Sequence, residues 1–204
     1  MTARTAANDT AAVVLAAGGG SRFPGTKQLA EVDGLPLVAH AVAAAHAADI
    51  TQVLVVVGHD AKRVARAAGR GGHAWIVSNP DHGLGQASSL RAGITAASAL
   101  ADVEVLVVLL GDQPRIAPQA VRAVSQAVRF GADAARARYD DGPGHPVAFA
   151  RRVWPRLAAV QGDVGARNVL ATLEVIEVPI AGATPPDVDT AADLRHLSGE
   201  AAGT

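Results

Sequence analysis

The amino-acid sequence is poor in several residue types, and each shortage excludes a class of protein or of chemistry. It has no cysteine, which excludes disulfides, thiolate metal ligands and cysteine nucleophiles. No apolar run reaches the roughly 18 residues that a membrane-spanning helix needs. The formal net charge is −1 and there is no basic run, so neither nucleic acid nor a membrane is expected as a partner. We expect a cytoplasmic protein.

Small and branched apolar residues are abundant, since 50% of the 204 residues are hydrophobic, which is enough for a sizeable core. We expect one domain over residues 11–197, a disordered tail at 1–10 and a C-terminal tail at 198–204. Apolar runs bounded by turn residues predict strands at 11–17, 52–57, 74–78, 103–110, 132–139, 147–150 and 174–179. The segments between them predict helices at 36–49, 88–101, 118–130 and 151–160. Three further helices are predicted by one bound each: one ends at residue 68, one begins at residue 166 and one ends at residue 197. This alternation predicts an α/β fold with a parallel sheet covered by helices on both faces, and the order becomes irregular after residue 139.

The loop after the first predicted strand is the most informative stretch of the chain. It contains Leu15-Ala16-Ala17-Gly18-Gly19-Gly20, followed by Arg22 and Lys27. Glycines let the backbone turn and bring its N–H groups close to a ligand, and the two cations can contact phosphate oxygens. Lys27 is also one of only two lysines in the chain. The loop therefore suits a polyphosphate, although three glycines can equally form a plain strand-to-helix connection.

Two familiar phosphate-binding patterns do not fit this loop. The dinucleotide fingerprint of dehydrogenases needs a third glycine where Phe23 stands, and an acidic residue at the end of the next strand, where Asp60 comes too late. A P-loop needs Ser or Thr after its lysine, whereas Gln28 follows Lys27. A nicotinamide oxidoreductase and a P-loop enzyme are both disfavoured.

Aspartates near two other turns are candidate metal ligands. Asp112 follows the strand at 103–110 in the turn Gly-Asp-Gln-Pro, so it lies at the edge of the sheet where α/β proteins bind ligands. A carboxylate there can hold Mg²⁺ against substrate phosphates, or it can be an ordinary turn aspartate. Asp187 and Asp189 are candidates for a second ligand, with Asp189 also a possible N-terminal cap of the last helix.

The remaining polar motifs are compatible with binding or with ordinary turns. His145 lies in Gly-His-Pro, and Asp163 and Arg167 lie in a glycine-bounded turn; these residues can contact an acceptor substrate or be solvated loop residues. Ser88 and Ser89, at the start of a predicted helix, can bind an anion or cap the helix. The other histidines show no metal-ligand spacing and no Ser-His-Asp order.

Taken in order, these motifs resemble the molybdenum cofactor cytidylyltransferase family within the MobA-like nucleotidyltransferase (NTP transferase) superfamily. The resemblance covers residues 11–197 and is stronger than any single motif. It rests on the glycine loop with Arg22 and Lys27, Asn79-Pro80 with Ser88-Ser89-Leu90-Arg91, Gly111-Asp112-Gln113-Pro114, Gly144-His145-Pro146, the segment 162–167, and Asp187-Val188-Asp189-Thr190.

The resemblance implies a three-layer Rossmann-like fold with a mostly parallel, mixed sheet, and Mg²⁺-dependent transfer of CMP from CTP to molybdopterin with release of pyrophosphate. It implies that the nucleotide contacts residues 15–20, Arg22, Lys27, Ser88 and Ser89. Among these, Arg22 and Lys27 are the catalytic cations. The resemblance further implies that the catalytic Asp112, together with Asp189, holds Mg²⁺. His145, Asp163 and Arg167 are implied to bind the acceptor. A client molybdoenzyme is a further partner to consider.

Ala17 favours CTP, because the guanylyl branch of the superfamily usually has glycine there. The family usually has Ser, Met and Gly at the positions of Gly20, Phe23 and Pro24, so the loop departs from the family pattern between its two cations. The alternatives are the same fold acting with GTP or on another phosphorylated acceptor, and a non-catalytic chaperone for the cofactor. A phosphate monoester is already ionised at neutral pH, so the reaction needs no general base.

Overall fold

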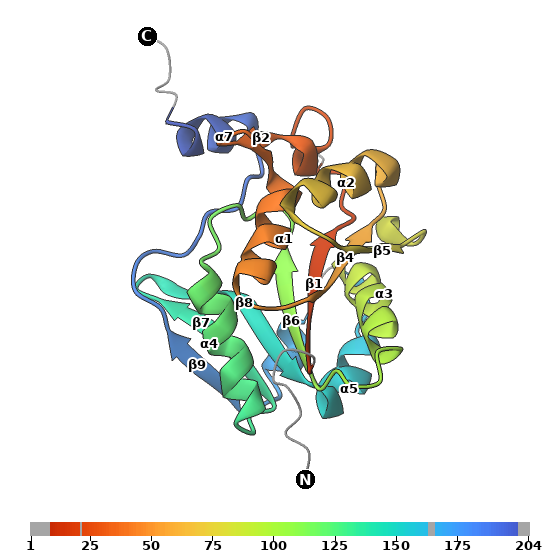
Figure 1. The fold of residues 1–204 in the computed structure, drawn as a ribbon, viewed down its shortest axis with the longest axis vertical. Helices are drawn as coiled ribbons and strands as arrows, with labels where there is room; N and C mark the ends of the chain where they lie inside the picture. Colours follow the sequence, from red (N-terminus) through yellow and green to blue (C-terminus); the bar gives the residue numbers. More distant parts are fainter. Residues whose placement is uncertain (1–8, 21, 163–165, 200–204) are drawn as a thin grey trace.

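The computed structural model describes residues 9–20, 22–162 and 166–199, which form a seven-stranded sheet with helices on both faces (Figure 1). The strand order is β5-β4-β1-β6-β8-β7-β9. β8 is antiparallel to both of its neighbours, and every other pair of neighbouring strands is parallel. The bounds are β1 (Thr10–Ala16), β4 (Gln52–Val57), β5 (Trp75–Ser78), β6 (Val105–Leu110), β7 (Ala134–Tyr139), β8 (Gly142–Ala150) and β9 (Val175–Pro179). The predicted α/β fold with a mostly parallel, mixed sheet is confirmed.

The helices divide into two layers. α1 (Leu37–Ala47), α2 (Ala61–Ala68) and α4 (Pro118–Arg129) pack on one face of the sheet, while α3 (Gln86–Ser98), α5 (Trp154–Ala158) and α6 (Arg167–Leu170) pack on the other. Alternate residues of β1 enter the two layers, Val14 on the α1 side and Val13 on the α3 side. The central strands are therefore apolar throughout, as expected of strands covered on both faces.

Helix α3 packs unusually close to the sheet. A Cβ atom added at Gly93 would lie 2.5 Å from Val13 Cγ1, so only glycine permits this approach. The close packing fixes the first turn of α3 relative to the carboxyl end of β1, where the glycine loop begins.

Two short elements precede α1. β2 (Glu31–Val32) and β3 (Leu35–Pro36) form a hairpin whose central residues Asp33 and Gly34 both have positive φ, of 52° and 74°. Pro36 lies in β3 and precedes the helix, whereas the sequence predicts that it starts the helix.

Several predicted boundaries are wrong. Thr10 is the first residue of β1 and is buried, although the sequence places it in the N-terminal tail. β8 begins at Gly142, five residues earlier than predicted, because the Gly/Pro-rich segment pairs with β7 across a register shift at Arg136/Ala137. The helix predicted over 151–160 is a 3-10 turn, η4 (Arg151–Val153), followed by α5. Residues 1–8 and 200–204 of the predicted tails are outside the described residues.

The last helix, α7 (Ala191–Leu197), brings the end of the chain back to the glycine loop, next to β2 in Figure 1. Val188, just before it, is fully buried against Val32 and Leu37, with Phe23 packed on the same cluster. Phe23, which departs from the family pattern, is therefore an apolar anchor for the loop. None of the helices in the described ranges is long and apolar enough to cross a membrane.

Candidate nucleotidyl-transfer site

The glycine loop and Asp112 meet because their strands are neighbours. β1 and β6 pair in parallel with Leu15 opposite Leu110, so the loops that leave their carboxyl ends start side by side. The Gly111 N–H donates to the Leu15 carbonyl at 2.9 Å. A Cβ atom at Gly111 would come within 3.1 Å of that carbonyl oxygen, a tight contact, so glycine at this position eases the close approach of the aspartate turn to the glycine loop.

Lys27 lies between two carboxylates from opposite ends of the chain. Its Nζ is 2.6 Å from Asp112 Oδ2 and 2.9 Å from Asp189 Oδ1. Arg22 donates to the other oxygen of Asp189 at 2.7 Å. Four residues that the sequence assigns to catalysis or metal binding are thus in direct contact.

The charges in this cluster are strongly coupled. Burial lowers the pKa of the Lys27 ammonium, but the carboxylates of Asp112 and Asp189 outweigh this and raise the pKa above its usual value. The hydrogen bond from Lys27 is the main cause that lowers the pKa of Asp189. Lys27 is therefore charged and Asp189 ionised at neutral pH.

The backbone around Lys27 positions its side chain. Lys27 begins the 3-10 turn η1 (Lys27–Leu29), and Gln28 in the same turn donates from Nε2 to the Gly18 carbonyl at 2.8 Å. Gly20 has φ of +62°, and a Cβ atom there would lie 3.2 Å from Lys27 Cγ. Thr26 donates from Oγ1 to Asp60 at 3.1 Å, which ties the loop to the start of α2.

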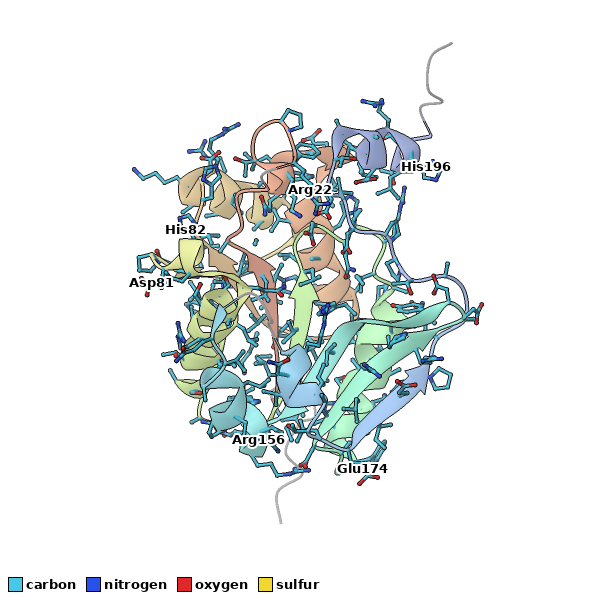
Figure 2. All side chains as sticks on the ribbon, turned by 180° about the vertical axis from the view of Figure 1, so that it is seen from behind. Arg22, Asp81, His82, Arg156, Glu174 and His196 are labelled. Atoms are coloured by element: carbon cyan, nitrogen blue, oxygen red, sulfur yellow. The ribbon has the colours of Figure 1, made fainter. Side chains whose placement is uncertain are left out.

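This cluster borders a cavity of about 720 Å³ at the edge of the sheet. Its charged lining residues are Arg22, Lys27, Asp112 and Asp189, beside the backbone of the glycine loop. Its uncharged lining includes Leu15, His82 of η3 (His82–Leu84), Gln86 and Ser89. Two of these lining residues, Arg22 and His82, are labelled in Figure 2, where Arg22 lies nearer to α7 than His82 does. We call this space the first cavity.

A second cavity of about 680 Å³ adjoins the first and shares Leu15, Gln86 and Leu110 with it. Its polar lining includes Gln113, Arg136, His145, Arg167 and Asp187. Apolar side chains of β6, β8 and α6 provide most of the remaining wall.

The structure separates the two candidate aspartates near the C-terminus. Asp189 borders the first cavity, whereas Asp187 borders the second. Burial, followed by the charge of Asp112, raises the pKa of Asp187, while a hydrogen bond from Gln113 opposes the shift. Asp189 is not a helix cap, because Thr190 caps α7 and Asp193 completes its capping box. Asp189 is therefore free to pair with the cations of the loop.

Most residues predicted to bind the nucleotide line the first cavity, and two do not. Ala16 is buried in the sheet. Ser88 is inside α3, because the helix begins at Gln86 after Gly85, and its hydroxyl donates to the Gly85 carbonyl at 2.8 Å. Neither serine caps the helix, so the interpretation of Ser88 and Ser89 as helix caps is wrong. Ser89 does line the cavity.

The structure describes two of the three residues that the sequence predicts to bind the acceptor. His145 and Arg167 line the second cavity, while Asp163 is outside the described residues. His145 is in β8 and not in a turn, and burial is the main cause that lowers its pKa. Tyr139 donates to the His145 carbonyl at 2.8 Å, and burial raises the pKa of Tyr139 to about 12.

Sequence reasoning assigned no role in the site to four residues that border the cavities or support their walls: Gln28, Asn79, Gln113 and Arg136. Gln28 and Gln113 each follow a residue that the sequence does single out, Lys27 and Asp112. Their position next to Lys27 and Asp112 was the sequence signal that could have identified these two glutamines. The sequence contains no such signal for Arg136, which is one of several arginines near a predicted strand.

The donor set fits a divalent ion. Asp112 Oδ1 is buried and has no hydrogen-bond partner among the described residues, and the other oxygen of Asp112 shares a cation with Asp189. Carboxylate oxygens at a phosphate-binding edge are the ligands that Mg²⁺ prefers. Within the described ranges no group of three or more His, Asp or Glu side chains could hold a metal, so an ion here would depend on further oxygens from substrate and water.

Comparison of the sequence with known protein families identifies the family to which this site belongs. A family described as the MobA-like NTP transferase domain matches residues 12–177, which includes the glycine loop, Asp112 and most of the second cavity. The chain belongs to this family. The predicted superfamily is confirmed, whereas the finer assignment to the molybdenum cofactor cytidylyltransferases goes beyond this match.

Relatives of this MobA-like domain include a curated 3-deoxy-manno-octulosonate cytidylyltransferase from Anaeromyxobacter dehalogenans, 40% identical over 122 residues, or 59% of this chain. The alignment spans 48% of that relative, so the chain matches about half its length. A solved Rv0371c homologue from Mycobacterium sp. strain JC1 is 32% identical, with a TM-score of 0.84 over 94% of this chain and 96% of that one. Rv0371c of Mycobacterium tuberculosis H37Rv, solved in complex with manganese, is 31% identical, with a TM-score of 0.76 over 94% and 98% of the two chains.

Proposed function

We propose that this protein is a Mg²⁺-dependent cytidylyltransferase that transfers CMP from CTP to the terminal phosphate of molybdopterin and releases pyrophosphate. The observation that carries the proposal is the contact of Lys27 with Asp112 and Asp189 at the border of two adjoining cavities. In this proposal the first cavity holds the nucleotide and the second holds the acceptor.

The arrangement suits an in-line transfer. An oxygen of the acceptor phosphate attacks the α-phosphorus of CTP, the bond from that phosphorus to the α,β-bridging oxygen breaks, and pyrophosphate leaves with the electron pair. The attacking phosphate has a second pKa near 6, so it is ionised at neutral pH and no side chain has to remove its proton. The two substrates are held in adjoining spaces, which supplies the required alignment.

Arg22 and Lys27 have the main electrostatic role. Pyrophosphate gains negative charge as it leaves, and cations fixed in advance stabilise that charge best. Both side chains pair with Asp189, so binding of a triphosphate would exchange one anionic partner for another.

Asp112 and Asp189 would hold the metal ion, which when bound screens the repulsion between the substrate phosphates. Asp189 is the better second ligand, because it shares Lys27 with Asp112, whereas Asp187 belongs to the acceptor side. The manganese complex of the M. tuberculosis relative supports a divalent ion in this fold.

The choice of CTP rests on Ala17, which lines the first cavity, and is supported by the name of the Anaeromyxobacter relative. The same relative favours a second candidate function, transfer of CMP to a sugar acid such as 3-deoxy-manno-octulosonate. The sugar would then occupy the second cavity, near Arg136 and Arg167.

A pyrophosphate-release assay with Mg²⁺ separates these possibilities. We expect release with CTP and molybdopterin, and little with GTP or with 3-deoxy-manno-octulosonate. Release with CTP and the sugar acid alone would support the second candidate. Tight molybdopterin binding without turnover of any nucleotide would contradict both and indicate a cofactor chaperone.

A further inference from the structure

We infer that Gln28 is a positioning residue that fixes the orientation of the peptide between Gly18 and Gly19, so that the Gly19 N–H faces the first cavity as a donor. The inference rests on the proposed function in one respect, that the first cavity binds the triphosphate of a nucleotide.

Gln28 is held beneath the glycine loop with a fixed amide orientation. It is buried, with 3% of its surface exposed, whereas Gly18 and Gly19 are exposed. Its Nε2 lies 2.8 Å from the Gly18 carbonyl oxygen. A carbonyl can only accept, so the amide atom that faces it must be the nitrogen. Gln28 therefore holds the Gly18 carbonyl on the buried side of the loop.

The same contact determines where the Gly19 N–H points. The peptide between Gly18 and Gly19 is trans, and in a trans peptide the carbonyl and the following N–H point in opposite directions. The Gly19 N–H is therefore directed away from the buried Gln28, toward the exposed side of the loop. Both glycines line the first cavity, and within the described ranges this N–H has no acceptor. It is thus available to a phosphate oxygen.

Two adjacent glycines do not fix this orientation by themselves. Reversing the peptide changes ψ of Gly18 and φ of Gly19 by about 180°, which is the difference between type I and type II turns. The φ of Gly19 is not positive here, and the reversed peptide would make it positive. Glycine adopts positive φ readily, whereas other residues do so at a cost. Without Gln28, the Gly18 carbonyl oxygen could turn toward the phosphates in place of the N–H.

The other amide atom of Gln28 argues against a purely stabilising role. Oε1 is buried and has no hydrogen-bond partner among the described residues. An unpaired buried oxygen destabilises the fold, and an apolar side chain of similar shape would avoid that cost. Stability alone therefore does not favour glutamine at this position, whereas control of the loop requires its amide N–H.

Calorimetric binding of Mg–tripolyphosphate to Gln28→Met tests the inference, because this ligand contains only the phosphates. Methionine keeps the length of the side chain and removes the donor. We expect the affinity to fall about 10-fold, the usual effect of losing one hydrogen bond to a charged group, and Mg–CTP to weaken by the same factor. The melting temperature should change little, because the variant also removes the unpaired oxygen. Gln28→Glu is a second variant that keeps the shape and cannot donate when ionised.

Two alanine backgrounds distinguish control of the peptide from general support of the loop. Gly19→Ala disfavours positive φ, and therefore the reversed peptide, without help from Gln28. Its Cβ would lie at an ordinary contact distance of 3.5 Å from His59. In this background we expect Gln28→Met to weaken tripolyphosphate binding less than about 3-fold.

Gly18→Ala is the matched control background. Its Cβ enters open space, and reversal of the peptide leaves φ of residue 18 unchanged, so alanine there does not exclude the reversed state. We therefore expect Gln28→Met to keep its full effect in this background. A merely structural role of Gln28 would not produce this difference between the two alanine backgrounds.

Equal losses of tripolyphosphate affinity from Gln28→Met in the Gly18→Ala and Gly19→Ala backgrounds would overturn the inference, and would indicate that Gln28 acts by supporting Lys27. Unchanged tripolyphosphate affinity in Gln28→Met would overturn it as well, while leaving the proposed function intact. A wild-type protein that binds neither Mg–CTP nor Mg–tripolyphosphate would contradict the proposed function, and the inference with it.

Discussion

Replacing Lys27 by methionine tests whether the two carboxylates beside it form a metal site. Methionine keeps the length of the side chain and removes the charge that Asp112 and Asp189 share. All three side chains are partly shielded, with exposed fractions of 12% for Lys27, 20% for Asp112 and 37% for Asp189. The substitution leaves two carboxylates facing each other without the lysine between them.

The size of the effect follows from the geometry. Both oxygens contact one ammonium, so they lie no more than about 5.5 Å apart, where two like charges at an effective dielectric constant near 20 repel by about 3 kcal/mol. Water around Asp189 reduces this, and we expect Lys27→Met to lower the free energy of unfolding by roughly 1–3 kcal/mol. For a domain of this size, the melting temperature then falls by roughly 2–12 °C.

Magnesium should reverse the loss. Thermal unfolding would be followed by circular dichroism in EDTA and in excess MgCl₂, for wild type and Lys27→Met. Because the wild-type lysine competes with the ion, Mg²⁺ should stabilise the variant more than the wild type. Lys62→Met is the control, since Lys62 is the only other lysine and is exposed on α2. A variant that is destabilised but gains no more from Mg²⁺ than wild type would refute the metal assignment.

Three further predictions concern the same site. Arg22→Gln should weaken Mg–CTP binding about 10- to 100-fold in calorimetry, with little change in melting temperature. The control is Arg63→Gln, which should bind Mg–CTP normally, because Arg63 is similarly exposed and also paired with one aspartate. Equal Mg–CTP affinities of the two variants would contradict the prediction. Gly20→Ala should lower CTP affinity, because the added Cβ crowds the Lys27 side chain. Gly25→Ala adds its Cβ in open space, so it should cause only backbone strain. Equal losses of CTP affinity in the two variants would argue against crowding. Ion pairing lowers the folded-state pKa of Asp189, so its stabilising effect is complete above the unfolded pKa near 3.9 and is lost as pH falls through the folded value. Asp189→Asn should therefore reduce stability in urea unfolding at pH 7, and this difference should shrink as the pH is lowered below the unfolded pKa. A pH-independent difference would contradict the ion pair.

The sequence predicted the architecture well, because the signal is local. The apolar runs of β1, β4 and β6 and the turns after them identify buried parallel strands and the edge where ligands bind. The Gly/Pro-rich start of β8 was missed because its strand conformation depends on pairing with β7, which no local pattern records. The start of α3 was misplaced by two residues, since Gln86 and Ala87 give no signal that outweighs the two serines.

The site was predictable as a set of residues but not as a geometry. Arg22, Lys27, Asp112 and Asp189 were all named from their motifs, yet the contact of Lys27 with both carboxylates depends on α7 returning to the glycine loop. The division between Asp187 and Asp189 depends on alternate orientations along one extended segment. The hydrogen bonds from Asn79 to Ser88 and Ser89 are likewise not revealed by the spacing of these residues in the sequence.

The most direct test of the account is pyrophosphate release by Asp112→Ala with CTP, Mg²⁺ and molybdopterin. Asp112 contacts the central lysine and has a buried oxygen without a partner in the described structure, so it is the residue on which metal binding most depends. We predict that wild type releases pyrophosphate and that the variant, still folded by circular dichroism, loses this activity by at least about 100-fold. A folded Asp112→Ala protein with wild-type turnover would contradict the assignment of this cluster as the nucleotidyl-transfer site.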